Sequence, residues 1–174
     1  MEGLIIRDIQ PDDFPEVTRL YHLTWLETYP NAELGITREL IDESYKDAYS
    51  PENEKKRRDR VANLPKHEKY VVAVLGKKIV GVADMLVLED KNKLRTIYVL
   101  PEFQGKGVGS ALWNAVEKFR DPNKKSVVEV ATYNKKAIAF YKKLGFKETG
   151  RTFYDEGLFN SRGIRIPETE FIME

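Results

Sequence analysis

Three glycines recur at alternate positions in the segment Gln104-Gly105-Lys106-Gly107-Val108-Gly109, which has the composition of a phosphate-binding turn. The segment follows an apolar run with the character of a strand and precedes residues at helical spacing. Glycine lets the backbone approach a ligand closely, and the first amides of a helix lack partners within the helix. These amides, the helix dipole and the charge of Lys106 all favour an anion. The pattern therefore indicates a diphosphate site, although a turn that only closes a loop would also use these glycines.

Two other phosphate-binding motifs do not fit this segment. A P-loop requires serine or threonine after its lysine, whereas Lys106 is followed by Gly107, so no hydroxyl could reach a magnesium ion. A dinucleotide-binding fingerprint requires Gly-x-Gly-x-x-Gly, and the third glycine here comes one residue early. Glu129 lies about 20 residues downstream, where such a fingerprint places its ribose ligand. However, Glu129 alternates with Val128 and Val130, so we interpret it as a residue on the solvated face of a strand.

The composition excludes several other kinds of site. The chain contains no cysteine, so it has no disulfide, no thiolate zinc site and no cysteine nucleophile. The two histidines, His22 and His67, have no carboxylate cluster around them, and no metal site is predicted. The basic run at 55–58 is flanked by acidic residues, which predicts a solvated helix face rather than a nucleic-acid site.

Length and charge are those of one ordinary domain. The 174 residues carry a net charge of +1, with 41% apolar and 33% charged residues, so we expect a single domain over residues 1–174. A near-zero charge provides no field for nucleic acid or an anionic membrane. No apolar run approaches the ~18 residues of a membrane span, and the N-terminus lacks the basic and apolar regions of a signal peptide. We therefore expect a cytoplasmic protein without a nucleic-acid or membrane partner.

The N-terminal part of the chain predicts one strand and three helices. Residues 4–7 form a short apolar strand. Asp13, with Glu16 three residues later, has the pattern of a capping box at the start of the first helix. Thr37 is the expected cap of the second helix, and Ser50-Pro51 is expected to begin the third.

From Tyr70 onward the hydrophobic pattern changes to that of strands. A hairpin turns at Gly76-Lys77, and Gly145 is expected to stop the last helix. The order of elements predicts one α/β-type domain around a mixed sheet. We predict strands at 70–75, 79–88, 94–100 and 127–132, helices from 104 and over 135–144, and two final strands in the tail.

Two segments together resemble the signatures of the GNAT superfamily of N-acetyltransferases. Val99-Leu100-Pro101, followed by Gln-x-x-Gly-x-Gly at 104–109, is similar to its acetyl-CoA motif. Residues 134–146 are similar to its second signature, Asn-x-x-Ala-x-x-Phe-Tyr-x-x-x-Gly-Phe. The clear resemblance extends from Tyr70 to Gly150. It implies a GNAT-like fold: a central mixed, mostly antiparallel sheet, splayed between the fourth and fifth strands, with helices on both faces.

The resemblance implies acetyl-CoA as co-substrate, without a metal. The diphosphate would bind the glycine turn, and the pantetheine amides would pair with the free backbone edge of the splayed strand. Leu94, Ile97 and Val99 do not share one parity, which indicates a bulge in that strand or the irregularity of a short one. Asn134 is a helix cap in its own right, and the resemblance adds a bond to the cofactor. The implied cofactor-binding residues are Ile97, Tyr98, Val99, Gln104, Gly105, Lys106, Gly107, Val108, Gly109 and Asn134.

Tyr141 is the proton donor that the resemblance implies, because the matching family tyrosine protonates the departing thiolate; its helical spacing also fits a core aromatic. The attacking amine must be neutral, and an alkyl ammonium has a pKa of about 10.4, so a base is required. Many family members carry a glutamate in the strand before the glycine turn, whereas residues 93–100 contain no carboxylate. Asp84 is the first candidate for this base, and Glu27, Glu33 and Glu89 are further candidates, although a solvated surface acid explains each of them better when it is taken singly.

The stretch Trp25-Leu26-Glu27-Thr28-Tyr29 resembles a pattern in the first helices of PaiA-type polyamine acetyltransferases, where these helices cover the acceptor site. The resemblance implies direct acetyl transfer to a primary amine such as spermidine, and the lack of cysteine argues against an acetylated thiol intermediate. The tentative substrate residues are Glu27, Tyr29, Glu33 and Asp42. Protein N-termini or lysines are alternative acceptors, a non-catalytic acetyl-CoA sensor is an alternative of another class, and a homodimer is left open.

Overall fold

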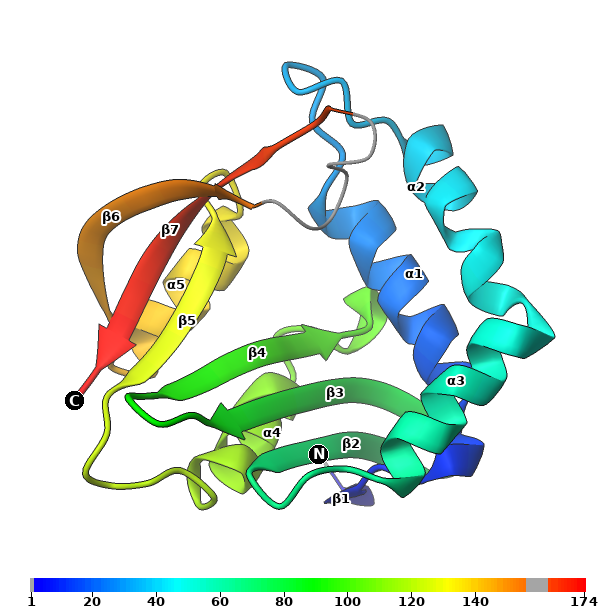
Figure 1. Ribbon diagram of the computed structural model, residues 1–174, viewed down its shortest axis with the longest axis horizontal. Helices are drawn as coiled ribbons and strands as arrows, with labels where there is room; N and C mark the ends of the chain where they lie inside the picture. Colours follow the sequence, from blue (N-terminus) through cyan, green and yellow to red (C-terminus); the bar gives the residue numbers. More distant parts are fainter. Residues whose placement is uncertain (1, 156–162) are drawn as a thin grey trace.

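A seven-stranded sheet forms the centre of the computed structural model, which describes residues 2–155 and 163–174 (Figure 1). The strand order is β1-β2-β3-β4-β5-β7-β6, and all neighbours are antiparallel except β4 and β5. The sheet is therefore mixed and mostly antiparallel, as predicted. The strands are β1 (Leu4–Asp8), β2 (Glu68–Leu75), β3 (Lys78–Val87), β4 (Asn92–Val99), β5 (Ser126–Ala131), β6 (Lys147–Asp155) and β7 (Ile166–Met173).

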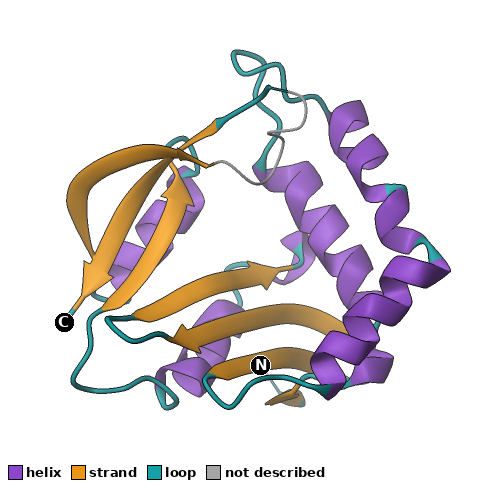
Figure 2. Cartoon of the chain, in the orientation of Figure 1, coloured by secondary structure: helices purple, strands orange, loops and turns teal. Residues whose placement is uncertain are grey.

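Helices cover both faces of the sheet (Figure 2), which confirms that part of the predicted fold. Apolar side chains of α4 pack against one face of β2 and β3, and those of α1 and α3 pack against the other. Burial of these two apolar layers is the main force that holds the helices to the sheet. The helices are α1 (Glu16–Thr28), α2 (Arg38–Tyr45), α3 (Pro51–Ala62), α4 (Val108–Glu117) and α5 (Lys135–Lys143).

The sheet opens between β4 and β5. These strands pair only at Asn92 with Ser126 and at Lys93 with Val127, and they diverge beyond these pairs (Figure 1). Among the residues that the structure describes, the edge of β4 that faces β5 has no strand partner from Arg95 onward. The predicted splay between the fourth and fifth strands is confirmed, and it leaves backbone donors and acceptors of β4 available to a ligand.

A bulge in β4 lies beside this opening. The pairing with β3 places Thr96 opposite Asp84 and Leu94 opposite Met85, so Arg95 is an extra residue without an opposite partner. Leu94 and Ile97 pack into the same apolar cluster although they are three residues apart, which a regular strand does not allow. Of the two sequence-based explanations for the irregular parity, the bulge is therefore the correct one.

Most of the predicted helix ends are confirmed by their capping contacts. The Thr37 hydroxyl accepts a hydrogen bond from the Leu40 amide at 3.2 Å, and the Ser50 hydroxyl accepts one from the Asn53 amide at 3.3 Å. Gly145 follows α5 with a φ of +100°, the left-handed conformation that terminates a helix.

The start of α1 differs from the prediction. Asp13 lies in a separate turn, Pro11–Asp13, where its carboxylate accepts a hydrogen bond from the Gln10 amide at 2.7 Å and pairs with Arg7. Pro15 restricts Phe14 to an extended backbone, so α1 begins only at Glu16. The Glu16 carboxylate then accepts a hydrogen bond from the Ile79 amide at 2.9 Å and ties α1 to β3.

Candidate active site

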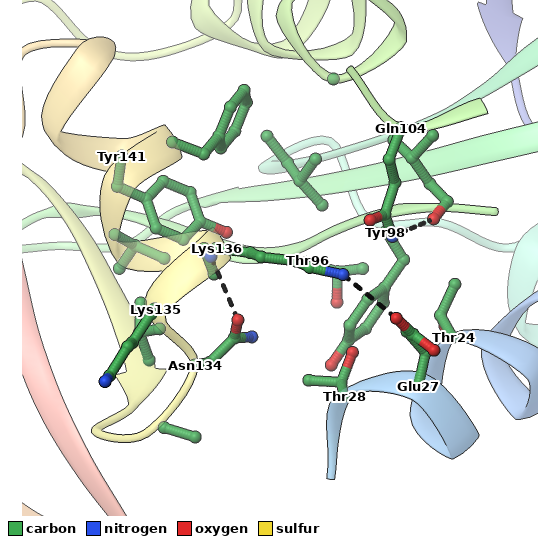
Figure 3. Close-up of a pocket in the computed structure, with 18 of the residues that line it drawn as sticks. Thr24, Glu27, Thr28, Thr96, Tyr98, Gln104, Asn134, Lys135, Lys136 and Tyr141 are labelled. Carbon is green, nitrogen blue, oxygen red and sulfur yellow. Dashed lines mark hydrogen bonds and ion pairs between the residues drawn. The ribbon is translucent and has the colours of Figure 1, made fainter. Parts of the chain in front are cut away.

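A cavity of about 980 Å³ occupies the opening between β4 and β5 (Figure 3). Its walls come from α1, β4, the turn before α4, β5, α5 and β7. Residues far apart in the sequence therefore meet here because the sheet is splayed. Among these elements, the glycine turn, β4 and α5 are those expected to hold the cofactor and are called the cofactor side; the end of α1, β5 and β7 are called the acceptor side.

The glycine turn contributes backbone rather than side chains to the cavity. Gly105 and Gly107 line it with φ values of +71° and +86°, a region that favours glycine. No described atom lies within 4 Å of the position where a Cβ of either residue would stand. Gly107 is also the N-cap of α4, so the unpaired amides of the first helical turn begin at this residue. The sequence predicted a helix from Gln104, but α4 starts only at Val108.

Two residues of the predicted phosphate motif do not line the cavity. Val108 is buried in the core below α4, at 1% exposure. The Lys106 ammonium lies over the ring of Phe103, 5.6 Å from its centroid. Both residues were predicted to bind the cofactor, and the structure places neither of them in the cavity lining, which includes Gly105 and Gly107 of the same turn.

The β4 edge and the start of α5 complete this side of the cavity. Ile97, Tyr98 and Val99 all line it. The side-chain amide of Gln104 donates a hydrogen bond to the Val99 carbonyl at 3.1 Å and holds the glycine turn against the strand (Figure 3). Asn134 also lines the cavity, and its side-chain oxygen caps α5 by accepting a hydrogen bond from its third residue at 3.1 Å. The arrangement fits an elongated ligand that carries amide and phosphate groups.

Tyr141 lies on α5 and borders the same cavity, with 6% of its surface exposed. Its ring packs edge-on against Phe140 and Phe146, with centroids 5.4 and 5.8 Å away. Figure 3 shows the side chain extending from α5 toward the cavity. Burial raises the pKa of Tyr141, and no hydrogen bond to its hydroxyl occurs within the described part of the chain. The residue is thus both a core aromatic and a cavity residue.

Of the four residues predicted to bind the acceptor, two line the cavity and two do not. Glu27 and Tyr29, at the end of α1, line the cavity, as expected for the acceptor side. The Glu27 carboxylate lies 3.1 Å from the Lys136 ammonium, and the Tyr29 hydroxyl lies 2.8 Å from that of Tyr98. Burial raises the pKa of Tyr29 to about 12.

Glu33 and Asp42 lie outside the cavity, which corrects the sequence-based assignment. Glu33 is exposed in the connection before α2. Asp42 lies at the edge of α2 nearest α1, where its carboxylate is 2.7 Å from the Nε2 atom of His22. Ile41 and Tyr45 of α2 are buried in an apolar cluster, whereas Asp42 remains exposed.

Asp84, the tentative base, also lies outside the cavity lining. It is 1% exposed on β3, where its carboxylate accepts a hydrogen bond from the Arg95 Nε atom at 2.9 Å. Arg95 also donates a hydrogen bond to the Glu68 carboxylate at 3.2 Å, and Glu68 in turn pairs with Arg60. Burial raises the pKa of Asp84, and the charge of Arg95 opposes this shift. Arg95, the extra residue of the β4 bulge, lines the cavity, whereas its guanidinium is bound to Asp84 and Glu68. The weaker candidate Glu89 is exposed beyond β3.

Two acids that sequence reasoning missed line the acceptor side, Glu129 and Glu168. Glu129 was interpreted as solvated because it alternates with valines, but the polar face of β5 borders the cavity. Its carboxylate lies 2.7 Å from the Lys93 ammonium. Glu168 is half-buried on β7, and burial, with the negative charges of Asp155 and Glu129, raises its pKa to about 7. No local pattern indicated Glu168, because only the pairing of β7 with β5 brings it to the cavity.

The described residues contain neither a metal-binding group nor a membrane-spanning helix. Within 2–155 and 163–174, no group of three or more His, Cys, Asp or Glu side chains could hold a metal ion. In the same ranges, no helix has the length and apolar character needed to cross a membrane.

Comparisons with known proteins agree with this geometry. The family model described as "Acetyltransferase (GNAT) domain" matches residues 32–160. An uncharacterised N-acetyltransferase of Methanocaldococcus jannaschii is 41% identical over 58 residues, which cover 32% of this chain and 26% of that protein. The N-acetylaspartate synthetase of Danio rerio is 37% identical over 87 residues, which cover 48% of this chain and 31% of that protein. The matched part of the chain thus spans less than a third of either relative.

A similar fold occurs in a solved structure. The PaiA N-acetyltransferase of Thermoplasma acidophilum, crystallised in complex with coenzyme A, aligns with a TM-score of 0.70. The alignment covers 96% of this chain and 97% of that chain, at 22% sequence identity. At this identity the likeness is one of fold.

Proposed function

This chain belongs to the GNAT family of acetyltransferases, and from that premise we propose that it transfers an acetyl group from acetyl-CoA directly to a primary amine. The observation that carries the proposal is the opening of the sheet between β4 and β5. It places the left-handed glycine turn, a free strand edge and Tyr141 around one cavity. The domain assigned to this activity is the whole chain, residues 1–174.

The proposed binding mode assigns a separate task to each part of the cofactor side. The backbone at Gly105 and Gly107, with the first amides of α4, would hold the diphosphate of acetyl-CoA. The free edge of β4 at 97–99 would pair with the amides of the pantetheine arm. Asn134 would donate to the same arm through its side-chain nitrogen, since its oxygen caps α5.

The shape of the cavity and the residues in it support direct transfer. The cofactor side and the acceptor side belong to one cavity, so an amine and a thioester can meet within it. The chain has no cysteine that could carry an acetyl group between the two substrates. Tyr141 would give its proton to the sulfur as the carbon–sulfur bond breaks, and amides of β4 would stabilise the charge that develops on the thioester oxygen.

A polyamine is the proposed acceptor. The Trp25–Tyr29 stretch resembles that of polyamine acetyltransferases, and its Glu27 and Tyr29 line the acceptor side. Two more carboxylates, Glu129 and Glu168, border the same space. Acidic groups beside an aromatic ring favour a flexible chain with several ammonium groups.

A coenzyme A release assay with a panel of amines tests both the proposed acetyl transfer and the proposed preference for a polyamine. Spermidine should be acetylated with a higher kcat/KM than a monoamine of similar length. The preference should decrease with salt, since the Debye length falls from about 10 Å at 0.1 M to about 3 Å at 1 M. Glu27→Gln should reduce the preference, whereas Glu33→Gln, outside the cavity, should leave it unchanged.

Three other outcomes would contradict parts of the proposal. Equal kcat/KM for spermidine and the monoamine at low salt would exclude the polyamine preference. Faster acetylation of a peptide N-terminus, or of aspartate, would identify a different acceptor. Binding of acetyl-CoA without release of coenzyme A to any amine in the panel would indicate a sensor.

A further inference from the structure

The acceptor side of the cavity contains one carboxylate without a cationic partner. Glu27 pairs with Lys136, and Glu129 pairs with Lys93. Glu168 borders the same space, and no Lys, Arg or His of the described residues lies within ion-pair distance of it. A half-buried carboxylate that borders this cavity without an ion-pair partner calls for a functional explanation.

The strand register fixes the direction in which Glu168 faces. On β7 it lies opposite Ala131 of β5, and Glu129 is two residues from Ala131 on the same face of β5. The neighbouring residues Thr169 and Phe171 occupy the other face, where Phe171 belongs to the core beneath α5. Glu168 therefore faces the gap between the two halves of the sheet, together with Glu129.

We propose that Glu168 accepts the proton that the acceptor ammonium must lose before it attacks the thioester. This inference rests on the proposed acetyl transfer and assigns the base that the sequence left open. Glu168 replaces Asp84 in that role, because Asp84 is bound to Arg95 and does not line the cavity.

The proton and electron balance of the step is complete without another reactant. One ammonium proton passes to the Glu168 carboxylate, directly or through one water, and from there to solvent. The freed nitrogen lone pair forms the bond to the carbonyl carbon, and the electron pair of the carbon–sulfur bond leaves with sulfur. Tyr141 gives its proton to that sulfur and is reprotonated by the second proton that the nitrogen loses.

The environment of Glu168 suits this task. Burial is the main cause of its raised pKa, the negative charges of Asp155 on β6 and Glu129 on β5 add to it, and Lys93 on β4 opposes them. Tyr29 and Tyr133 also line this space; burial is the main cause of their raised pKa values, and the negative charge of Glu168 adds to both shifts. The resulting pKa of about 7 matches the pH at which a general base is most effective.

The pH dependence of kcat/KM for the amine tests this inference, measured from pH 5.5 to 9.5 with coenzyme A release. In the wild-type protein, kcat/KM should rise about tenfold per pH unit at low pH and level off above an inflection near pH 7. In Glu168→Gln, kcat/KM at pH 7 should fall by about 10²-fold. The inflection should also disappear, so that kcat/KM keeps rising toward pH 10 with the fraction of neutral amine.

Two matched variants separate this role from a structural one. Glu170→Gln changes the next residue on the same face of β7, whose carboxylate pairs with Arg151 at 3.0 Å, and it should keep the wild-type profile. Glu129→Gln keeps the proposed base and removes a negative neighbour, so the inflection should move to lower pH. A thermal melt of each variant checks that it is folded.

The possible failures can be told apart. A folded Glu168→Gln variant with the wild-type inflection and rate at pH 7 would contradict this inference alone. Loss of the inflection in Glu129→Gln, with its retention in Glu168→Gln, would assign the proton to Glu129 and overturn the inference. Absence of acetyl transfer by the wild-type protein would contradict the proposed function together with it.

Discussion

Tyr141 contributes its ring to the core and its hydroxyl to the cavity, so the two contributions can be separated by one substitution. Proton transfer from tyrosine to a thiolate is uphill by about 2 kcal/mol in water, since their pKa values are about 10 and 8.5. Burial raises the pKa of Tyr141 further, but the same dry environment also destabilises the thiolate. A hydrogen bond from the hydroxyl to the developing negative charge lowers the barrier in either case.

For Tyr141→Phe we expect kcat to fall by about 10²-fold, the low end for the loss of a general acid. The melting temperature should change little, because the ring contacts with Phe140 and Phe146 remain. The KM for acetyl-CoA should also change little, since the lost interaction belongs to the transition state. The measurement is steady-state kinetics under conditions in which chemistry limits the rate, together with a thermal melt.

Tyr70→Phe provides the matched control for this variant. Tyr70 is buried on the other side of the sheet, and its hydroxyl lies 2.9 Å from that of Tyr21. Its loss should cost about 1 kcal/mol of stability and leave kcat unchanged. A Tyr141→Phe variant that behaves like the control, with a lower melting temperature and the wild-type kcat, would remove Tyr141 from the mechanism.

Single acids were the least predictable part of the site. Alternation with valine places Glu129 on the polar face of a strand, but it does not say whether that face meets solvent or a cavity. The position of Glu168 depends on the pairing of β7 with β5 and on the separation of β5 from β4, which are long-range properties of the fold. Asp42 and Asp84 were misplaced for the same reason, because the face that each side chain occupies depends on tertiary packing.

At the scale of elements, local signals were reliable. The caps at Thr37 and Ser50 and the helix stop at Gly145 are interactions within a few residues, so the sequence contains all that is needed to predict them. The irregular parity of β4 correctly indicated its bulge. The start of α1 was wrong because Pro15 outweighed the Asp13 and Glu16 pattern, and the proline restricts the backbone before it.

A substitution in the glycine turn tests whether this element binds the cofactor. We expect Gly107→Val to weaken acetyl-CoA binding by at least about 10-fold, or ~1.4 kcal/mol, because its side chain would enter the space proposed for the diphosphate. The left-handed backbone at Gly107 adds a strain of about 1–2 kcal/mol to the variant. Isothermal titration calorimetry with acetyl-CoA measures the change in affinity.

Gly76→Val separates strain from ligand contact. Gly76 has a φ of +63° in the hairpin between β2 and β3, and no described atom lies within 4 Å of its Cβ position either. The substitution should therefore cause a similar loss of stability and no loss of affinity. Unchanged affinity in a folded Gly107→Val protein would show that this turn does not contact the cofactor.

At the scale of the whole molecule, the two halves of the sheet are joined by two residue pairs. The proposed cofactor site uses the glycine turn and β4 from one half and Asn134 and Tyr141 from the other. Acetyl-CoA should therefore stabilise both halves together, by about 2.7 kcal/mol at a hundredfold excess over its Kd. A thermal-shift series measures this effect, and ATP or NAD should have a much smaller one. A larger shift with NAD than with acetyl-CoA would contradict the proposed cofactor.

The two sides of the cavity are built from different parts of the polypeptide. The cofactor side combines backbone, from the turn at 105–107 and the strand edge at 97–99, with Asn134 and Tyr141, whereas the acceptor side is proposed to act through side chains of α1, β5 and β7. Mutations that exchange the side chains of the acceptor side leave the backbone of the other side in place. Evolution can therefore change the amine that such a scaffold acetylates by a few point mutations, without having to rebuild the machinery that delivers the acetyl group.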